Sequence, residues 1–220
     1  MTPAVAETRL VRIADLHPTQ ITVGFGEVAQ KRIRLRSEIQ SQGELGLPTR
    51  AVPVVLAPDG ALYLIDCHHL ALAMQQEGVE RAPVRQLADF STIAVHDFWS
   101  ALEGRGWCHP YDAAGRRRPY SAIPSTLVAL LNDPFRSLSS ALRRSGGFTK
   151  TAAPFSEFNW ADFLRTRIPA QTVAMDFAGA LGQAMRLART AAAQHLPGWV
   201  ADPAAVPLIN LQAAGAPANR

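Results

Sequence analysis

The chain has 220 residues, enough for one large domain or for a small domain with an extension, and 48% of them are hydrophobic. Its formal charge of +4 suits phosphate-bearing ligands without requiring nucleic acid. The two cysteines, Cys67 and Cys108, lie far apart and form no CxxC motif, which excludes a disulfide framework and a zinc site. No apolar stretch is long enough for a signal peptide or a membrane span, so we expect a soluble, cytoplasmic protein.

Residues 1–92 alternate short strands with helices. "TRLVRIADLHPTQ" (8–20) contains a strand, and a helix is predicted over 27–42 and ended by Gly43. Val28, Leu35 and Ile39 form one apolar stripe of this helix. Arg32 lies close to the stripe, either as a snorkelling side chain at the edge of the core or as a cation directed into a site.

Two apolar runs, "RAVPVVL" (50–56) and "ALYLID" (61–66), are joined by residues 57–60, a combination that indicates a β-hairpin. A helix over 69–77 ends at Gly78, and "APVRQLADF" (82–90) supplies another strand. The pattern predicts an α+β domain over residues 1–92, with a small mixed sheet and helices.

After residue 93 the chain is predicted to be helical. The helical segments are "AVHDFWSALEGRG" (94–106), "PSTLVALLNDPFRSLSSALRRSGG" (124–147), "SEFNWADFLRTRIP" (156–169) and "TVAMDFAGALGQAMRLARTAAAQH" (172–195). The last of these places Val173, Phe177, Leu181, Ala184 and Ala188 on one face. We therefore expect a helical extension over 93–195 and a C-terminal tail over 196–220.

The stretch "LIDCHHLALA" places Asp66, Cys67, His68 and His69 where a strand is followed directly by a helix. The start of a helix offers free backbone N–H groups and the positive end of its dipole, which favour a phosphate. Asp66 is suited to cap the helix or to hold a metal ion that bridges to a phosphate, and both histidines are suited to donate hydrogen bonds to phosphate oxygens.

A structural alternative remains open for this turn. It is also compatible with a capped helix that carries two surface histidines and a small buried thiol. Cys67 near a helix N-terminus is expected to have a lowered pKa and some reactivity, whereas a buried structural thiol would be inert. Neighbouring helical positions diverge, so His68 and His69 are not expected to bind one metal together.

The order of these elements resembles the ParB/sulfiredoxin superfamily. The turn is similar to the Asp-Gly-His-His-Arg motif of its free serine kinases, where the histidines hold nucleotide phosphates, with Cys67 in place of the glycine. Cys67 also matches the position of the sulfiredoxin cysteine, but the flanking glycines and arginine are absent. A broader resemblance is to the subgroup called "ParB-like putative nuclease", carried by "PTQITVGFGEV", "IDCHHLALA", "NDPFRSLSSALRRSGGF" and "FSEFNWADFLR", which span most of residues 16–168.

The resemblance implies a site and a chemistry. Phosphates would be bound by Cys67, His68, His69, Arg32 and Arg136, and Asp66 and His68 would take part in catalysis. Asp66 would hold Mg²⁺, and Glu27 would be the base that activates a substrate hydroxyl. Leu70 stands where the family has an arginine, so Arg32, Arg136 or Lys150 would have to replace that phosphate ligand.

Three functions follow from the resemblance. The first is phosphoryl transfer from ATP or another nucleoside phosphate, with Mg²⁺, to a small hydroxylated substrate. The second is a metal-dependent nuclease, which needs a further carboxylate near Asp66. The third is a nucleotide-gated DNA-binding module, as in the partition proteins. Against this third function, "FTKTAAPF" (148–155) does not suit the start of a DNA-reading helix. The sequence leaves the oligomeric state open.

Overall fold

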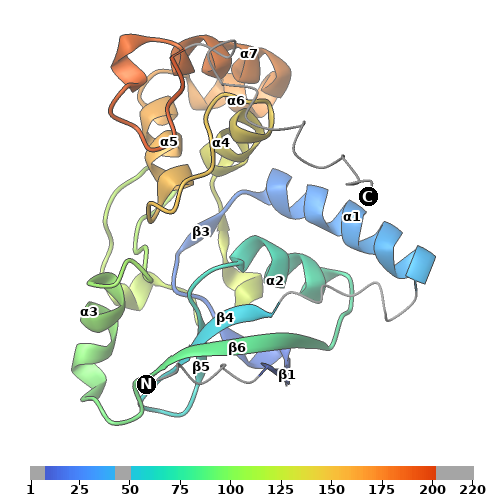
Figure 1. The fold of residues 1–220 in the computed structure, drawn as a ribbon, viewed down its shortest axis with the longest axis vertical. Helices are drawn as coiled ribbons and strands as arrows, with labels where there is room; N and C mark the ends of the chain where they lie inside the picture. Colours follow the sequence, from blue (N-terminus) through green and yellow to red (C-terminus); the bar gives the residue numbers. More distant parts are fainter. Residues whose placement is uncertain (1–7, 43–50, 202–220) are drawn as a thin grey trace, which may run out of the picture. The chain divides into compact units, whose positions relative to one another are not determined.

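The computed structural model describes residues 8–42 and 51–201 (Figure 1). The chain divides into two compact units, Met1–Leu138 and Ser139–Arg220, and the division falls inside helix α4 (Pro134–Arg144). The predicted organisation into 1–92, 93–195 and 196–220 stays a prediction, and residues 202–220 of the predicted tail lie outside the described residues.

The first unit is built on a mixed sheet of five strands in the order β1-β6-β4-β5-β2. β1 pairs with β6 and β4 with β5 in antiparallel register, whereas β4–β6 and β2–β5 are parallel. The strands are β1 Thr8–Arg12, β2 Leu16–His17, β4 Val52–Leu56, β5 Leu62–Leu64 and β6 Arg81–Asp89. The expected α+β class and the hairpin are confirmed; Gly60, at φ +82°, donates to the carbonyl of Ala57 in the hairpin turn.

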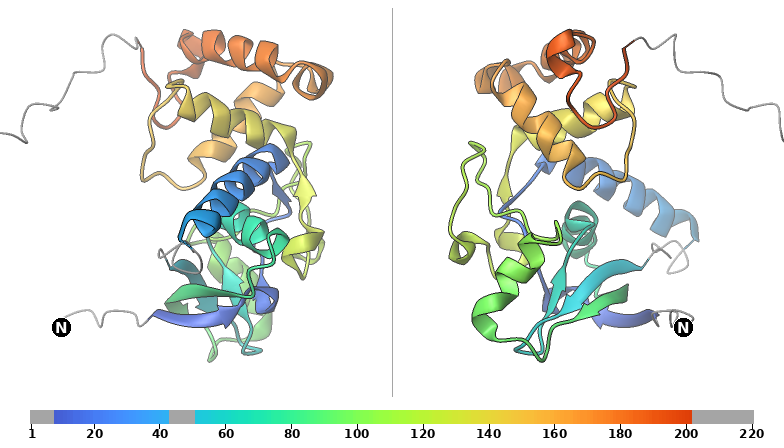
Figure 2. Two further views of the ribbon diagram at one scale, coloured as in Figure 1. Left: turned by 90° about the vertical axis from the view of Figure 1, so that its right-hand side faces the viewer. Right: turned by 60° about the vertical axis from the view of Figure 1, so that its left-hand side comes forward.

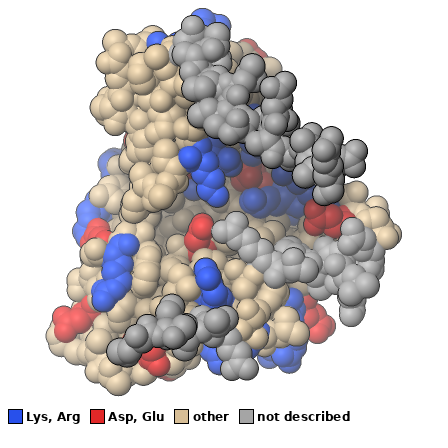
Figure 3. Space-filling view, viewed as in Figure 1, with Lys and Arg blue, Asp and Glu red and all other residues tan. Residues whose placement is uncertain are grey.

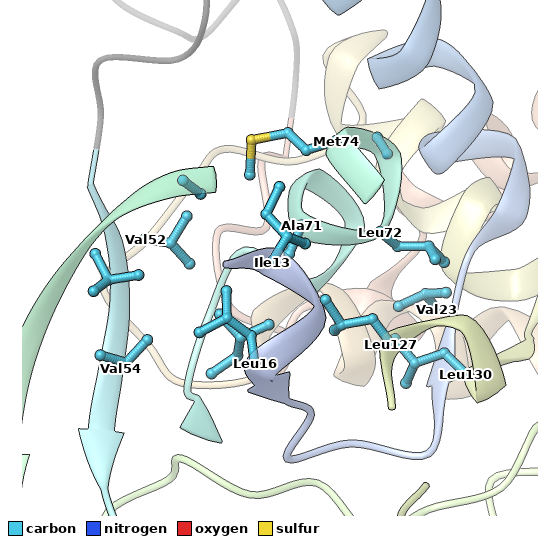
Figure 4. Close-up of a cluster of buried hydrophobic side chains, with 14 of the residues drawn as sticks. Ile13, Leu16, Val23, Val52, Val54, Ala71, Leu72, Met74, Leu127 and Leu130 are labelled. Carbon is cyan, nitrogen blue, oxygen red and sulfur yellow. The ribbon is translucent and has the colours of Figure 1, made fainter. Parts of the chain in front are cut away.

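One face of this sheet is covered by α1 (Phe25–Gln42) and α2 (His68–Gln76) (Figures 1 and 2). Alternate strand residues such as Val52 and Val54 belong to this core, together with Leu72 of α2 (Figure 4). The predicted stripe of α1 is confirmed, because Val28 and Leu35 are buried and Ile39 packs against the same cluster. Short 3₁₀ turns at Ile13–Asp15 and Leu127–Ala129 contribute Ile13 and Leu127.

The opposite face of the sheet is covered over part of its area by an aromatic cluster. Val55, the neighbour of Val54, points to this side and packs with Phe90 and with Phe98 of α3 (Phe98–Glu103). Further 3₁₀ turns lie at Val95–Asp97 and Tyr120–Ala122. The partly buried residues of the cluster come from β5, the end of β6, α3 and the segments around α3.

A second, two-stranded parallel ladder joins β3 (Thr22–Val23) to β7 (Leu131–Asn132). Each of these strands runs directly into a helix, β3 into α1 and β7 into α4. Because the strands are parallel neighbours, the two helices begin side by side. The helix expected over 124–147 is wrong in its first part: residues before Pro134 form a 3₁₀ turn and β7, and the helix begins at the proline, which suits a first helical position.

The second unit contains α5 (Ser156–Arg165), α6 (Ala170–Met175), α7 (Phe177–Ala188) and a 3₁₀ turn at Ala191–Ala193. Trp160 is fully buried and stacks on Phe148 with ring centroids 4.5 Å apart. The single helix expected over 172–195 is wrong, because the chain forms α6 and α7, although Val173, Ala184 and Ala188 of the expected face are buried. The carboxylate of Asp176 accepts the Gly179 N–H at 2.8 Å and starts a new helix, which leaves Phe177 40% exposed.

Candidate functional site

The turn before α2 has an unusual backbone. Cys67 is the N-cap residue with φ +66° and ψ +20°, in the left-handed region, and its side chain makes no capping hydrogen bond. The carboxylate of Asp66 accepts the Cys67 N–H at 2.6 Å. The expectation that Asp66 caps α2 is therefore wrong: its carboxylate is used one residue before the helix begins. The first turn of α2 has neither a side-chain cap nor an acidic residue.

His68 is a buried residue with a defined partner. Its Nε2 accepts the backbone N–H of Thr19 at 3.1 Å, and the Thr19 hydroxyl donates to the carbonyl of Leu64 at 2.6 Å. Burial, reinforced by the nearby positive charge of Arg136, lowers the pKa of His68 to about 3. The ring is therefore neutral at physiological pH, with its proton on Nδ1. The alternative of a surface histidine is wrong for this residue.

His69 is oriented in a similar way. Its Nε2 accepts the backbone N–H of Gly24 at 3.0 Å, just before the start of α1. Both rings thus direct a lone pair at the segment 19–24, so in this arrangement Nε2 of neither ring donates to a phosphate, and Nδ1 carries the proton. The two histidines attach this segment, and with it the start of α1, to the first turn of α2.

The start of α1 is held by side chains from the β7–α4 segment. The N–H of Phe25 donates to Oδ1 of Asn132 at 2.9 Å, and the N–H of Gly26 donates to Oγ of Ser137 at 3.0 Å. The first backbone N–H groups of α1 are therefore already paired inside the protein, as helix termini require. α1 also has an acid, Glu27, in its first turn. Glu27 is only 8% exposed, and its Oε1 lies 3.5 Å from Nζ of Lys31.

The start of α4 carries its own acid as well. Oδ1 of Asp133, a residue only 2% exposed, accepts the N–H of Phe135 at 2.9 Å. Arg136, in the first turn of α4, is 5% exposed and close enough to His68 to influence its pKa. The N-termini of α1, α2 and α4 therefore meet in one place. No side chain caps α2, and the acid of its turn, Asp66, precedes the N-cap residue.

The structure separates the predicted phosphate ligands. Arg136 and the 66–69 turn come together, with Glu27 on the helix whose start His69 holds. Arg32 does not join them. Its Nε lies 2.6 Å from Oε1 of Glu77. Glu77 is just past the C-terminal end of α2, about 14 Å along the helix from the 66–69 turn. The snorkelling alternative for Arg32 fits this placement. Lys150 belongs to the second unit.

Four residues that are not among the expected site residues also build this site: Thr19, Gly24, Asn132 and Ser137. The glycines at positions 24 and 26 directly before and inside the first turn of a helix are a signal for a close backbone approach. For Thr19, Asn132 and Ser137, no local pattern indicates the partner.

Few of the described side chains are placed so that they could hold a metal ion at this site. Within the part of the chain that the structure describes, no three His, Cys, Asp or Glu side chains are grouped so as to hold a metal ion. Asp66 is an exposed carboxylate beside the α2 N-terminus. Mg²⁺ is commonly held by one or two carboxylates together with substrate phosphates, so these residues fit a metal that arrives with a nucleotide better than a resident one.

Residues 9–166 match the family model described as "Putative ParB-like nuclease". The chain belongs to this family. The match covers the whole site, from Thr19 to Ser137, and confirms the ParB-like fold expected from the motifs. The family description concerns the group as a whole and assigns no reaction to the residues of this site.

Solved structures give a second comparison. The crystal structure of protein Atu1540 from Agrobacterium tumefaciens is 45% identical, with a TM-score of 0.81, and the match covers 88% of this chain and 98% of that one. The C-terminally truncated chromosome-partitioning protein ParB from Caulobacter crescentus, complexed with CTP-gamma-S, is 16% identical over 85% of this chain and 94% of that one. Its TM-score of 0.29 is too low to support an inference about this ParB-like chain.

A search of the curated proteins found no match. No helix in the described ranges is both long enough and apolar enough to cross a membrane.

Proposed function

We propose that this ParB-like chain binds the phosphate groups of a nucleotide at the first turn of α2. The observation that carries the proposal is the contrast between the three helix N-termini that meet there. α1 has Glu27 in its first turn and α4 is capped by Asp133, whereas the first turn of α2 has no acid and no capping side chain, and Asp66 lies before it. An uncapped helix N-terminus is suited to accept an anion from outside the chain.

The electrostatics of the surroundings favour the same ligand. Each helix contributes roughly half a positive charge at its N-terminus. Arg136 is a positively charged side chain at low exposure, where charge interactions are stronger than in water, and Glu27 and Asp133 place carboxylates at the two neighbouring helix starts. His68 is neutral and contributes no charge of its own. Arg136 is thus the residue best placed to replace the arginine for which this chain has Leu70.

The reaction that we propose is phosphoryl transfer to a small hydroxylated substrate. Glu27 would accept the proton of the attacking hydroxyl, and Arg136 and the α2 N–H groups would stabilise the charge on the transferred phosphoryl group. Asp66 would hold a Mg²⁺ that arrives with the nucleotide, and this ion would neutralise phosphate charge. The protein's own part would be mainly positioning and charge stabilisation.

Cleavage of a phosphodiester by a ParB-like nuclease and nucleotide-gated DNA binding would use the same phosphate site. The nuclease needs more metal ligands than Asp66 alone, because hydrolysis by metal ions depends on a firmly held metal. Among the described residues, no three His, Cys, Asp or Glu side chains are grouped in this way. We therefore place phosphoryl transfer first and treat the other two activities as outcomes of the test.

The test begins with binding. ATP, ADP, CTP, GTP and pyrophosphate, each with and without Mg²⁺, are titrated calorimetrically into the wild type, Arg136→Met and Arg118→Met. Arg118 is an exposed arginine of a loop and serves as the charge-matched control. We expect the loss of Arg136 to weaken binding at least tenfold and the control to leave it unchanged. Thermal unfolding of each variant without ligand shows whether it is folded.

Asp66→Asn is expected to change nucleotide binding in the opposite direction to Arg136→Met. Its side chain is exposed, so folding should be little affected. Removing a negative charge beside the phosphate should strengthen binding without Mg²⁺ and reduce the additional gain that Mg²⁺ brings. Failure of every nucleotide to bind the folded wild type would overturn the proposal.

Activity assays separate the reactions. Glu27→Gln should retain nucleotide binding and lose transfer of the terminal phosphoryl group to a panel of hydroxylated acceptors. Degradation of labelled DNA by the wild type with Mg²⁺ or Mn²⁺, without phosphoryl transfer, would instead support the nuclease.

A further inference from the structure

The β1–β6 ladder has one face that neither core covers. Strand alternation places Val11, Ala82 and Val84 on the side of α1 and α2. The residues between them therefore face the other way, and the register pairs them as Thr8 with Arg85, Leu10 with Pro83 and Arg12 with Arg81. We call these six residues the outer β1–β6 face. The aromatic cluster on this side of the sheet includes none of them.

This face concentrates positive charge. Arg12 and Arg81 lie directly opposite one another on antiparallel strands, an arrangement that is destabilising for like charges. Within residues 8–42 and 51–201, Arg81 and Arg85 make no ion pair or hydrogen bond through their side chains. Among the described residues, the ion-pair partner of Arg12 is Asp15, with Nε and Oδ2 3.8 Å apart, and both side chains are more than half exposed, so this pair neutralises little.

The concentration of positive charge is a local feature of the surface. On the face of the molecule shown in Figure 3, basic and acidic side chains are interspersed, so the net charge does not by itself mark a binding surface. On the outer β1–β6 face, all of the charged residues are arginines. Arg81 and Arg85 are four residues apart on β6, a separation of about 13 Å along an extended strand.

We propose that the outer β1–β6 face binds the phosphate backbone of a nucleic acid. Arginine is the side chain best suited to phosphate oxygens, because its fork of N–H donors matches their geometry. The arginine spacing allows contact with two or three phosphates of one strand. Leu10, 63% exposed, and Pro83 are the apolar residues of the face, and it has no aromatic residue. A protein partner would need a larger apolar or aromatic centre than these two residues provide.

This surface is separate from the proposed nucleotide site. The α2 turn belongs to the helix that packs on the opposite side of the sheet. Binding of nucleic acid to the outer β1–β6 face should therefore leave the first turn of α2 accessible, and saturating nucleotide should not compete with it. The two proposals can fail independently.

The experiment measures binding of fluorescein-labelled single-stranded and double-stranded DNA of 20 nucleotides by anisotropy, from 50 to 300 mM NaCl. The test variant carries Arg12→Gln, Arg81→Gln and Arg85→Gln. A control carries Arg34→Gln, Arg116→Gln and Arg118→Gln, three exposed arginines elsewhere in the first unit, and loses the same charge. Glutamine retains much of the aliphatic stem, and circular dichroism checks that both variants are folded.

Each phosphate contact contributes about 0.7 to 0.9 to the slope of log K against log salt concentration. We therefore expect the slope of the test variant to be smaller in magnitude than that of the wild type by about two. The slope of the control should change much less. Equal losses in the two variants, or no DNA binding by the wild type at 50 mM NaCl, would overturn the proposal. So would equally tight binding of polyglutamate that depends on the same arginines, because the face would then recognise acidic peptides.

Discussion

Gly24 and Ser137 approach so closely that a Cβ on the glycine would lie 2.5 Å from the backbone nitrogen of the serine. This approach joins the start of α1 to the first turn of α4, and it follows from the parallel pairing of β3 with β7. Residue 24 must therefore be glycine for the two helices to begin where they do. Its N–H is at the same time bound by His69, so one residue connects all three helix N-termini.

Gly24→Ala is expected to be strongly destabilising. The new methyl group would meet backbone atoms, which cannot move aside as a flexible side chain can. We expect a loss of about 2–3 kcal/mol in the free energy of unfolding, at the upper end of overpacking effects. Gly26→Ala is the matched comparison, since its Cβ would lie 3.0 Å from the Ser137 hydroxyl, which can rotate. Urea denaturation should show the smaller loss for Gly26→Ala; equal losses would contradict this explanation.

Cys67 is held in a left-handed conformation that glycine adopts without cost. Comparison of Cys67→Gly with Cys67→Ala isolates the backbone contribution, because both variants lose the thiol and its packing against the core. We expect the glycine variant to be more stable than the alanine variant by about 1 kcal/mol. Chemical denaturation of the two variants measures this difference, and an alanine variant as stable as the glycine variant would show that the turn relaxes.

His68 should make the stability of the protein depend on pH. Its pKa is lowered to about 3 in the folded state, and the ordinary value is near 6.5. The unfolded chain therefore binds more protons between these values, so the free energy of unfolding falls as the pH drops below about 6.5. The limiting slope is about 1.4 kcal/mol per pH unit.

Urea denaturation of the wild type and of His68→Gln between pH 7.5 and 4.5 tests this expectation. Glutamine offers an amide oxygen to the Thr19 N–H and does not titrate. The variant should be less stable at pH 7.5 and should lose much less stability on acidification. Parallel pH profiles for the two proteins would show that other groups cause the dependence.

Glu77 binds two arginines of α1 at once. Hydrogen bonds from Arg36 and Arg32 lower the pKa of its carboxyl to about 2. The stabilisation is present above the ordinary pKa of a glutamate and is lost as the pH falls from about 4.5 towards 2. Because the arginines are partly exposed, we expect Glu77→Gln to cost only about 1 kcal/mol at pH 7.

Salt provides the check on Glu77. In 1 M NaCl the difference in unfolding free energy between Glu77→Gln and the wild type should shrink, because ions screen exposed pairs. A difference that is unchanged by salt would indicate that packing of the side chain, and not its charge, holds α1 on α2.

Local patterns in the sequence determined much of the fold. The stripe of Val28, Leu35 and Ile39 predicted the buried face of α1, and the turn residues 57–60 predicted the hairpin. These features depend on the period of apolar residues and on backbone preferences, which act over a few neighbours. The same reasoning was wrong at Asp176, where a capping carboxylate interrupts an otherwise continuous helical face.

The sequence by itself also indicated where the candidate site lies, because a polar turn between a strand and a helix is a local feature. What each side chain does there was decided only by tertiary structure. Gly24 meets His69 across 45 residues of chain, and Gly26 meets Ser137 across 111. The neutral state of His68, the pairing of Arg32 with Glu77 and the place of Arg136 beside the turn depend on such distant contacts. Burial and charge interactions act through space, so the positions of these groups cannot be read from the spacing of residues along the chain.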